Sequence, residues 1–305
     1  MAESCISQHV SIIIPTRDNE KDLIDCLDSI LLLEYNMDSI EVIIWDNNSE
    51  PESKTRLKDY LKSKFRPVKY RLIEFGDNYG VYTSRDELLN LVSKNTDYIL
   101  SIDDDVFLPP GLLNRMLRIF EEDPSVGIAG PRIVYDSHPD ETAHGAGFID
   151  LWTGRYRTAD TLSPCECDYI IGCCMLIKKK AADSTGGFDR EYFTSHGEVD
   201  FCMRAVKAGY KTVYNPEIVV RHRVDKGGTR TLERMYYVYR NKLRVIKKNW
   251  PVPQKWITLF YYSFFWFPKS VLDSIVANRK IYFPEIRIII KAMFDGWLNR
   301  FGKRI

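Results

Sequence analysis

Three consecutive carboxylates, Asp103-Asp104-Asp105, directly follow the apolar run of residues 98–102. Such a run is typical of a buried strand. Like charges this close repel one another and are costly to remove from water, so a folded cluster calls for a compensating cation. Hard oxygen ligands suit Mg²⁺ or Mn²⁺, and a divalent ion at the carboxyl end of a strand is placed to meet a phosphorylated ligand. An acidic turn with hydrated carboxylates explains the triplet alone equally well.

Two further strand-like runs end in polar turns. Residues 10–14 lead into Pro15-Thr16-Arg17-Asp18, and residues 40–45 lead into Asp46-Asn47-Asn48-Ser49. In a parallel sheet these turns would share an edge with the triplet, where an aspartate can accept hydrogen bonds from a ribose or a base. For any single aspartate, an Asx turn or a helix N-cap is about as good an interpretation.

A second acidic pair, Glu198 and Asp200, stands at the start of a predicted helix over residues 198–208. Two residues apart, the pair does not share a helix face. One carboxylate can therefore face a cleft while the other forms an ion pair, for which Arg204 at i+4 is suitably spaced. A first-turn acid that only stabilises the helix dipole is the alternative for Glu198.

His222 follows the apolar run of residues 217–220 and is flanked by two arginines. A lone histidine at a strand end is more often structural, but beside the triplet it is a candidate third metal ligand. The cysteines give no such signal. There are seven, and the cluster Cys165, Cys167, Cys173 and Cys174 lacks the paired spacing of zinc sites. We expect reduced cysteines that act as small buried hydrophobes.

The elements that must position these residues alternate along the first half of the chain. Strand patterns at residues 10–14, 40–45, 68–75 and 98–102 are separated by helix patterns, ending with a helix at 109–122. Alternation of this kind predicts βαβ units and an α/β fold with a mainly parallel, Rossmann-like sheet covered on both faces. Strands at 126–134 and 169–177 follow. We expect a catalytic domain over residues 1–225 and a helical extension over residues 226–305.

Charge separates the same two parts. The chain of 305 residues has a net charge of +1, yet residues 226–305 hold 17 Lys and Arg against 4 Asp and Glu, so residues 1–225 carry −12. The extension is expected to meet something anionic, either a membrane surface or a phosphorylated acceptor. We expect no nucleic-acid partner. Residues 1–10 lack a signal-peptide pattern, which favours a cytoplasmic protein, free or peripheral on the cytoplasmic face of a membrane.

Residues 256–267 contain eight aromatic residues in twelve and no charge. A helix of this length is too short to cross a hydrocarbon core of about 30 Å. Because Trp and Tyr favour the headgroup level, an interfacial helix is our first interpretation. A helix buried against the catalytic domain is nearly as good, since aromatic stripes are usually core. A transmembrane helix is the third.

The ordered set of motifs resembles family 2 of the inverting glycosyltransferases, which have the GT-A fold. The resemblance covers residues 8–245 and rests on these motifs in this order: Pro15-Thr16, Asp46, Asn78-x-Gly80, Asp103-x-Asp105, Gly186-Gly187-Phe188-Asp189, Gly197-Glu198-x-Asp200 and His222. Tyr239-Arg240-Asn241 is similar to a segment of rhamnosyltransferase-like members. An isolated Asp-x-Asp would be weak support, and the order is what is specific.

The resemblance implies a metal-dependent hexosyl- or deoxyhexosyltransferase. It would move a sugar from a nucleoside-diphosphate sugar to a hydroxyl of a glycan or lipid-linked acceptor, in glycan or glycolipid assembly. Asp105 would bind Mg²⁺ or Mn²⁺ with Asp103, and His222 would contact the metal or the diphosphate. Glu198 would be the catalytic base, with Asp200 as second candidate because many members carry Glu-Asp where this chain has Gly197-Glu198. The implied nucleotide-sugar contacts are Pro15, Thr16, Asp18, Asp46, Asn78, Gly80, Asp103 and Asp104.

Two alternatives remain at this stage. A sugar-phosphate nucleotidylyltransferase shares the nucleotide-binding half, but such proteins need a glycine-rich basic loop after the first strand, and residues 15–20 contain no glycine. A non-catalytic protein that binds membrane surfaces would use the basic extension, yet it gives no reason for the triplet and Glu198 to occur together.

Overall fold

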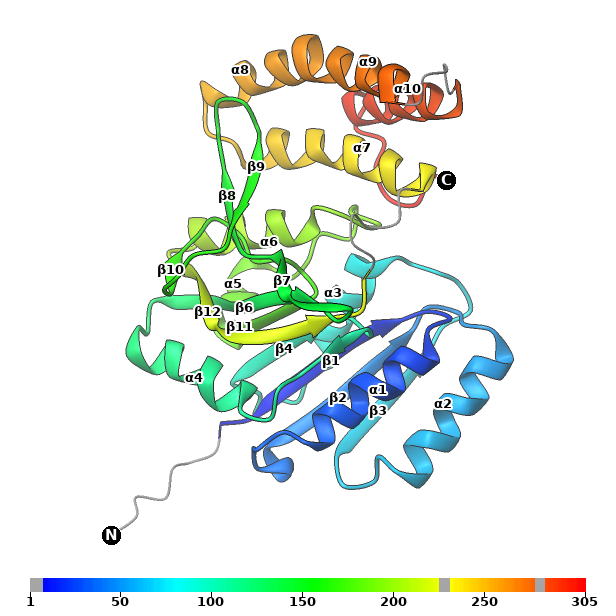
Figure 1. The fold of residues 1–305 in the computed structure, drawn as a ribbon, viewed down its shortest axis with the longest axis vertical. Helices are drawn as coiled ribbons and strands as arrows, with labels where there is room; N and C mark the ends of the chain where they lie inside the picture. The colour runs from blue at the N-terminus through cyan, green and yellow to red at the C-terminus, as the bar shows by residue number, and fades with distance from the viewer. Residues whose placement is uncertain (1–7, 225–230, 278–282) are drawn as a thin grey trace.

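The computed structural model describes residues 8–224, 231–277 and 283–305, and it shows an α/β unit with a layer of C-terminal helices stacked on one end (Figure 1). The boundary that the sequence predicts near residues 225–228, between the catalytic domain and the helical extension, lies outside the described residues. The architecture is the α/β fold with a C-terminal helical extension that the sequence predicts.

A ten-stranded sheet forms the centre of the α/β unit, in the order β10-β12-β6-β11-β4-β1-β2-β3, with β5 paired to β12 and β7 to β6. Neighbours β1, β2 and β3, and the pair β1 and β4, are parallel, as the alternating pattern predicts. The bounds are β1 (Val10–Thr16), β2 (Ile40–Asp46), β3 (Lys69–Glu74), β4 (Tyr98–Ile102), β5 (Val106–Phe107), β6 (Val126–Tyr135), β7 (His138–His144), β10 (Cys165–Glu166), β11 (Cys174–Lys178) and β12 (Lys211–His222).

The sheet is mixed because β11 runs antiparallel to both β4 and β6. Between β6 and β11 the chain forms only short strands and loops, and without a helical crossover it returns in the opposite direction. The strand expected at 169–177 begins only at residue 174, since Tyr169 forms an isolated bridge with Gly147. Residues 171–173 instead line the cavity described below.

Helices cover both faces of the sheet. On one face, Ile12 and Ile14 pack with Leu27 of α1 and Met116 of α4, while Ile13 on the other face belongs to a separate cluster with residues of α3 and α6. Every residue of β1 is buried, which is why its sequence is apolar without alternation. The bounds are α1 (Glu20–Leu31), α2 (Pro51–Ser63), α3 (Val81–Leu91), α4 (Leu112–Glu122), α5 (Lys179–Thr185) and α6 (Gly197–Lys207), with a 3₁₀ turn at Met37–Ser39.

The C-terminal layer begins with α7 (Leu232–Asn249), which lies between the α/β unit and the outer helices (Figure 1). The outer helices are α8 (Gln254–Tyr261), a π-helical turn (Tyr262–Trp266), α9 (Phe267–Ala277) and α10 (Phe283–Trp297). A hairpin of β8 (Ala146–Ile149) and β9 (Tyr156–Ala159) reaches up to this layer. There, Trp250 Nε1 donates a hydrogen bond of 2.8 Å to the Leu151 carbonyl.

Ion pairs fasten α7 to the α/β unit. Asp189 accepts from Arg244 at 2.8 Å and from Lys248 at 2.7 Å. Although burial opposes its charged form, these two cations hold the pKa of Asp189 below its usual range. The amide of Asn241 donates 2.6 Å to the carbonyl of Thr194, in the loop before α6. The extension is therefore packed closely against the unit that holds the sheet.

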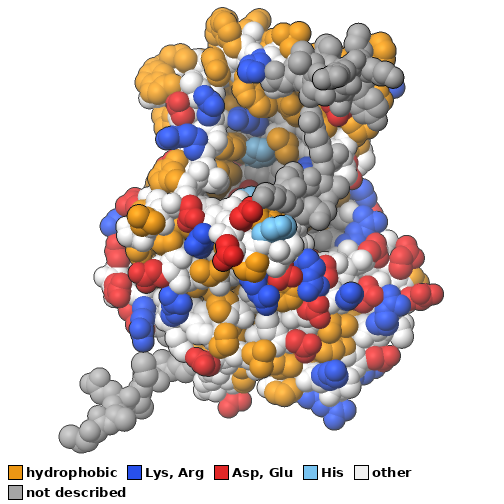
Figure 2. Space-filling view, in the orientation of Figure 1, with side chains coloured by type: hydrophobic (Ala, Val, Ile, Leu, Met, Phe, Trp, Pro, Cys, Tyr) orange, Lys and Arg blue, Asp and Glu red, His pale blue; other side chains and the backbone are white. Residues whose placement is uncertain are grey.

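The aromatic run of residues 256–267 presents two faces. Leu259 and Tyr262 are buried against the layer beneath, whereas Phe260 and Phe264 are 57% and 66% exposed. The exposed apolar side chains of α8 and the π-helical turn are Trp256, Ile257, Phe260, Phe264 and Phe265; we call them the aromatic face. Figure 2 shows apolar side chains gathered at this outer end of the molecule. Among the helices of the described ranges, none is long and apolar enough to span a membrane.

Replacing Asp189 by alanine is expected to destabilise the protein by about 2–3 kcal/mol, because Arg244 and Lys248 lose their shared, largely buried partner. Thermal unfolding should show a melting temperature lower by roughly 3–5 °C for a chain of this length. Because the pKa of Asp189 is depressed in the folded state, this stabilisation is present above its unfolded value and is lost as the pH falls.

The matched control is Asp59→Ala, which removes an exposed carboxylate on α2 and should leave the melting temperature unchanged. Equal melting temperatures for wild type and Asp189→Ala at neutral pH would contradict this account of how α7 is held.

Candidate active site

A cavity of about 770 Å³ opens where the carboxyl ends of β1 and β4 meet the first turns of α3, α6 and α7. Sequence-predicted residues contribute much of its wall. Two predicted residues, Asp46 and Asp200, do not line it. Those that do are Pro15, Thr16, Asp18, Asn78, Gly80, Asp103, Asp104, Asp105, Glu198 and His222.

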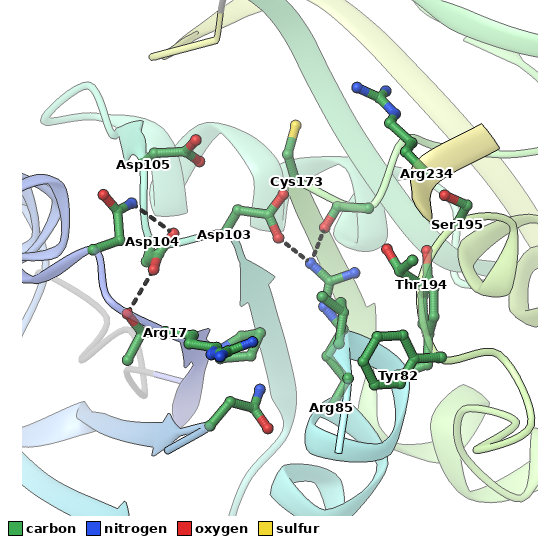
Figure 3. Close-up of a pocket in the computed structure, with 18 of the residues that line it drawn as sticks. Arg17, Tyr82, Arg85, Asp103, Asp104, Asp105, Cys173, Thr194, Ser195 and Arg234 are labelled. Carbon is green, nitrogen blue, oxygen red and sulfur yellow. Dashed lines mark hydrogen bonds and ion pairs between the residues drawn. The ribbon is translucent and has the colours of Figure 1, made fainter. Parts of the chain in front are cut away.

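The three carboxylates at the end of β4 point in different directions (Figure 3). Each has its own partner. Asp103 Oδ1 accepts a hydrogen bond of 2.5 Å from Arg85 Nη2. Asp104 accepts from Thr16 Oγ1 at 2.6 Å and from Asn19 Nδ2 at 3.1 Å. Asp105 Oδ1 lies 2.9 Å from Nε2 of His222. The repulsion expected from the sequence is thus reduced by four neighbouring side chains, and none of them is shared between two of the carboxylates.

Asp104 is set apart from the other two carboxylates. Burial raises the pKa of Asp104 to about 7, against the effect of the hydrogen bond from Thr16, and the charge of Asp105 adds to the rise. Since Asp104 faces Thr16 and Asn19, its part in the site is to tie the end of β4 to the turn after β1. The Asp104 side chain lines the cavity, but its oxygens are not grouped with those of Asp103 and Asp105.

Ligand atoms of Asp103, Asp105 and His222 lie within 4.8 Å of one another. Two carboxylate oxygens and an imidazole nitrogen are a donor set that fits Mn²⁺ or Mg²⁺. Burial disfavours the imidazolium of His222, but contacts with the Cys173 sulfur and the Asp105 carboxylate outweigh it and raise its pKa to about 11. A cation in this cluster would replace that proton. These residues therefore fit a divalent metal.

Cysteines take no part in this cluster. Cys167, Cys173 and Cys174 are buried, as expected for small hydrophobes, and Cys165 is partly buried. In the part of the chain that the structure describes, the Asp103, Asp105 and His222 group is the one set of three suitable ligands.

A buried arginine that the sequence analysis did not single out holds Asp103. Arg85 on α3 is 1% exposed, and its Nη2 also donates to the carbonyl of Gly172 at 2.6 Å. A Cβ at Gly172 would lie 2.7 Å from Arg85 Nη1, so the glycine is what lets the guanidinium pass. Because a buried cation needs an acceptor, the ion pair with Arg85 fixes the orientation of the Asp103 carboxylate.

Glu198 lies in the first turn of α6 and is almost completely buried. Its carboxylate accepts a short hydrogen bond from the Tyr82 hydroxyl, and the Tyr82 ring lies so close to Gly197 that a Cβ there would be 2.5 Å away. Burial raises the pKa of Glu198, an effect that the Tyr82 hydrogen bond and the nearby charge of Arg85 partly offset. A carboxylate with a raised pKa in a cavity is a candidate proton acceptor.

Asp200 lies on another side of α6 and makes structural contacts. The side chain is 0% exposed and accepts from Arg204 at 2.8 Å, which confirms the predicted i+4 pair. Asn249 and Lys248 of α7 donate to the same carboxylate at 2.7 and 3.1 Å. With its oxygens directed at three cationic or amide partners outside the cavity, Asp200 is placed to bind α7.

The turn after β2 presents a different residue from the one expected. Asp46 accepts from the Ser49 backbone, three residues on, at 3.1 Å and faces Lys54 at 3.4 Å, so its carboxylate is used within the turn and the start of α2. Asn47 lines the cavity instead, and its Oδ1 accepts from Ser84 at 3.1 Å. Asp18 lines the cavity and also accepts from the Glu50 backbone at 2.7 Å.

Gly80 shapes the cavity through its backbone. Its φ is +81°, and a Cβ would lie 2.3 Å from the carbonyl oxygen of Phe193. That carbonyl accepts from Val81 N at 2.9 Å, which joins the start of α3 to the loop before α6. Asn78 stabilises the turn by accepting from Gly80 N at 2.9 Å.

Several cavity residues had no signal in the sequence. His144 at the end of β7 is held neutral, because burial and the neighbouring His222 lower its pKa to about 4. Arg17 lines the cavity beside Asp18, while Thr231, Glu233 and Arg234 come from the start of α7. Figure 3 shows Arg234 and Arg17 on different parts of the wall.

A mixed sheet with such a cluster at its strand ends is the architecture of the GT-A glycosyltransferases, and solved structures show the same fold. The mannosyltransferase PcManGT from Pyrobaculum calidifontis, solved with GDP-Man and Mn²⁺, aligns with a TM-score of 0.63 at 15% identity over 97% of this chain and 89% of that one. Staphylococcus aureus TarS residues 1–349 with UDP-GlcNAc align with a TM-score of 0.64 at 15% identity, over 95% and 80%.

Residues 11–186 match Glycosyl transferase family 2, and because this is more than half of the chain, the protein belongs to that family. Membership favours the transferase prediction over the nucleotidylyltransferase alternative. Glu198, Asp200 and His222 lie beyond the matched segment, so their placement rests on the geometry above.

Two relatives illustrate the range of the family. An N-acetylglucosaminyl-diphospho-decaprenol L-rhamnosyltransferase of Mycobacterium tuberculosis is 31% identical over 179 residues, 50% of this chain and 58% of that protein. An uncharacterized protein of Sinorhizobium fredii is 27% identical over 268 residues, 79% of this chain and 27% of that protein. The chain thus spans about a quarter to three fifths of these relatives.

Replacing Asp105 by alanine is expected to lower Mn²⁺ affinity by at least about 10²-fold, since loss of an outer partner of a ligand alone costs roughly 10–100-fold. Electron paramagnetic resonance of free Mn²⁺ in the presence of a nucleoside diphosphate measures this. The fold should survive, because removing one carboxylate relieves repulsion in the triplet.

Asp104→Asn is the matched control: it changes the neighbouring acid but keeps an acceptor for Thr16, and Mn²⁺ affinity should stay within a few-fold of wild type. Equal losses in the two variants would show that the cluster of Asp103, Asp105 and His222 is not the metal site.

Proposed function

We propose that this chain is an inverting, metal-dependent glycosyltransferase that moves a hexosyl or deoxyhexosyl group from a nucleoside-diphosphate sugar to an acceptor hydroxyl. The observation that carries the proposal is the presence, in one cavity, of a metal-ligand cluster and a separate buried carboxylate, Glu198. A leaving diphosphate needs its charge neutralised, and an attacking hydroxyl needs a base. The two groups meet these two needs.

Asp103, Asp105 and His222 would hold Mg²⁺ or Mn²⁺, which when bound neutralises the charge that builds up on the departing diphosphate. The ion pair with Arg85 holds the Asp103 carboxylate in the cluster. The nucleotide would lie against Pro15, Thr16, Asp18, Asn47, Asn78 and Asp104 along the strand ends. Asp46 supports this wall from behind through its contact with Ser49.

Glu198 takes the proton of the acceptor hydroxyl as the hydroxyl oxygen forms its bond to the anomeric carbon. The bond from that carbon to the diphosphate oxygen breaks with its electron pair on the diphosphate, so the anomeric configuration inverts. No covalent bond to the protein is required. Burial raises the pKa of Glu198, which makes it a stronger base, and the Tyr82 hydrogen bond holds the carboxylate in place.

The acceptor we propose is a hydroxyl of a glycan that is attached to a lipid through phosphate. The name of the Mycobacterium tuberculosis relative supports it, because that protein acts on N-acetylglucosaminyl-diphospho-decaprenol. The basic C-terminal part of this chain, with its net charge of +13, also favours an anionic acceptor.

Release of nucleoside diphosphate from a panel of sugar nucleotides, with and without Mn²⁺, tests the proposed function. Glu198→Gln keeps the size and hydrogen bonding of the side chain but removes its basicity, so kcat should fall at least about 10²-fold with little change in donor affinity. In the wild type, activity should decline as the pH falls through the raised pKa of Glu198, because the protonated carboxyl cannot accept a proton.

Asp200→Asn serves as the contrast. It should lower the melting temperature through its buried contacts with Arg204 and Asn249, and the protein that remains folded should keep its kcat. If Asp200→Asn instead lost turnover at unchanged stability while Glu198→Gln stayed active, the two roles would have to be exchanged.

We also propose that the aromatic face docks on an anionic membrane surface. Its five side chains are exposed, and apolar side chains gather at the outer end of the C-terminal layer (Figure 2). The uncharged run that holds them lies within residues 226–305, whose net charge is +13. Aromatic side chains favour the headgroup level and cations favour anionic lipid, so one surface satisfies both preferences. Docking there would hold the protein beside a lipid-linked acceptor.

Flotation with anionic vesicles should recover the wild-type protein with the lipid at low salt, and raising the salt should reduce the bound fraction because it screens the charges. The double variant Phe260→Ser, Phe264→Ser should remain largely unbound. Leu162→Ser, which removes an exposed apolar side chain from the α/β unit, is the control and should float like wild type. Wild-type protein that stays with the soluble fraction at low salt would reject docking.

A further inference from the structure

A second hollow, of about 710 Å³, lies along α10 and is almost entirely apolar. Its apolar lining residues are Leu232, Phe283, Pro284, Ile286, Ile288 and Ile290. Arg287 and Lys291 are the charged residues of its lining, and none of the residues described there is acidic. We call this hollow the α10 groove. Its volume lies in the range of small-molecule sites, which are mostly apolar with few polar groups.

The α10 groove adjoins the active-site cavity through the first turn of α7. Leu232 lines the groove, while its neighbours Thr231, Glu233 and Arg234 line the cavity. One short stretch of chain therefore forms part of both walls.

A shared hydrophobic cluster supports the same connection. Phe193 of the cavity wall is buried with Tyr236 and Tyr237 of α7, and Ile288 of the groove wall packs against this cluster. The position of α10 on α7 is fixed by a hydrogen bond of 2.7 Å from Tyr236 to Asp295. The two hollows therefore lie on one packed scaffold.

The lining of the groove is poorly suited to water. Phe283 and Ile290 are 72% and 52% exposed, and Leu232 is also exposed. Concave apolar surface of this kind marks a binding site. The aromatic face of α8 is instead a convex set of protruding side chains, suited to a lipid surface, so the two apolar regions have different geometry and call for different ligands.

We propose that the α10 groove binds the aliphatic chain of an amphipathic acceptor whose phosphate end enters the active-site cavity. The inference deepens the proposed function and rests on it. An extended hydrocarbon chain matches an open apolar groove, and its anionic end would enter the cavity, where Arg17 and Arg234 line the wall. In the ligand, the phosphate end is attached directly to the chain. In the protein, the cavity and the groove are likewise adjacent, because residues 231–234 form part of both walls.

Photo-crosslinking with a farnesyl phosphate that carries a benzophenone at the tail end tests the site directly. Labelled peptides located by mass spectrometry should come from residues 283–291, and excess unlabelled farnesyl phosphate should suppress the labelling. Inorganic phosphate at the same concentration should suppress it much less, because it lacks the chain. Labelling confined to other segments would overturn the proposal.

Ile290→Asp puts a charge in the groove at an exposed position, and we expect farnesyl phosphate affinity to fall at least about tenfold. Phe294→Asp is the matched control, because it is equally exposed on α10 but does not line the groove, and it should bind like wild type. Equal losses in both variants, or in neither, would overturn the assignment. So would a groove variant that changes only the oligomeric state, since the groove would then be an interface between copies.

A separate measurement on the wild type and the same two variants tests the proposed function. Thermal stabilisation by Mn²⁺ with a nucleoside diphosphate depends on the cluster of Asp103, Asp105 and His222, and Ile290→Asp should retain it in full. Loss of farnesyl phosphate binding with this stabilisation intact supports the groove. Retained stabilisation without specific labelling rejects the groove alone, whereas a wild type without any stabilisation rejects the donor site.

Discussion

The carboxylates at the end of β4 are the constraint on which the site depends. Three adjacent acids at a buried strand end are compatible with a folded chain only if each meets a different compensating group. Arg85 reaches Asp103 from α3, Thr16 and Asn19 reach Asp104 from the turn after β1, and His222 reaches Asp105 from the end of β12. Segments distant in sequence are thereby brought to one point.

The contacts that offset the charges of the three carboxylates also explain why glycines stand where two chain segments approach closely around the cavity. Arg85 can cross to Asp103 only because Gly172 leaves room for its guanidinium. The first turn of α3, which carries Arg85 and Tyr82, is in turn set by Gly80 against the carbonyl of Phe193. Close approaches between chain segments therefore fix the positions of both Glu198 and the cluster of Asp103, Asp105 and His222.

Much of this arrangement could be predicted from the sequence. The strands that end at Thr16, Asp46 and Ile102 follow from apolar runs, and the pairing of Asp200 with Arg204 follows from helical spacing. Short-range patterns determine these features, so they can be recognised in a linear chain. The mainly parallel order of β1 to β4 follows in the same way, because helices separate the strands.

Other features depend on long-range packing. The antiparallel course of β11 and the late start of that strand depend on the loops between β6 and β11, whose pattern is neither helix nor strand. Arg85 looks like any arginine on a helix surface until α3 is placed against β4. Asn47 lines the cavity and Asp46 does not, and this depends on which of two neighbouring side chains points toward the cavity at the end of β2. The order of apolar and polar residues in the sequence does not determine these long-range arrangements.

The contacts of Asp200 have a consequence for where this protein can be divided. The segment that matches the family ends at residue 186, and a cut near residue 225 would seem to preserve a complete catalytic unit. Yet Asp200 is wholly buried two residues from Glu198, and Asn249 and Lys248 of α7 supply part of its compensation. A chain shortened before α7 would leave this buried charge short of partners beside the proposed base. The C-terminal layer therefore supplies partners that a buried charge of the sheet unit needs, and a chain cut before α7 is a poor substitute for the whole.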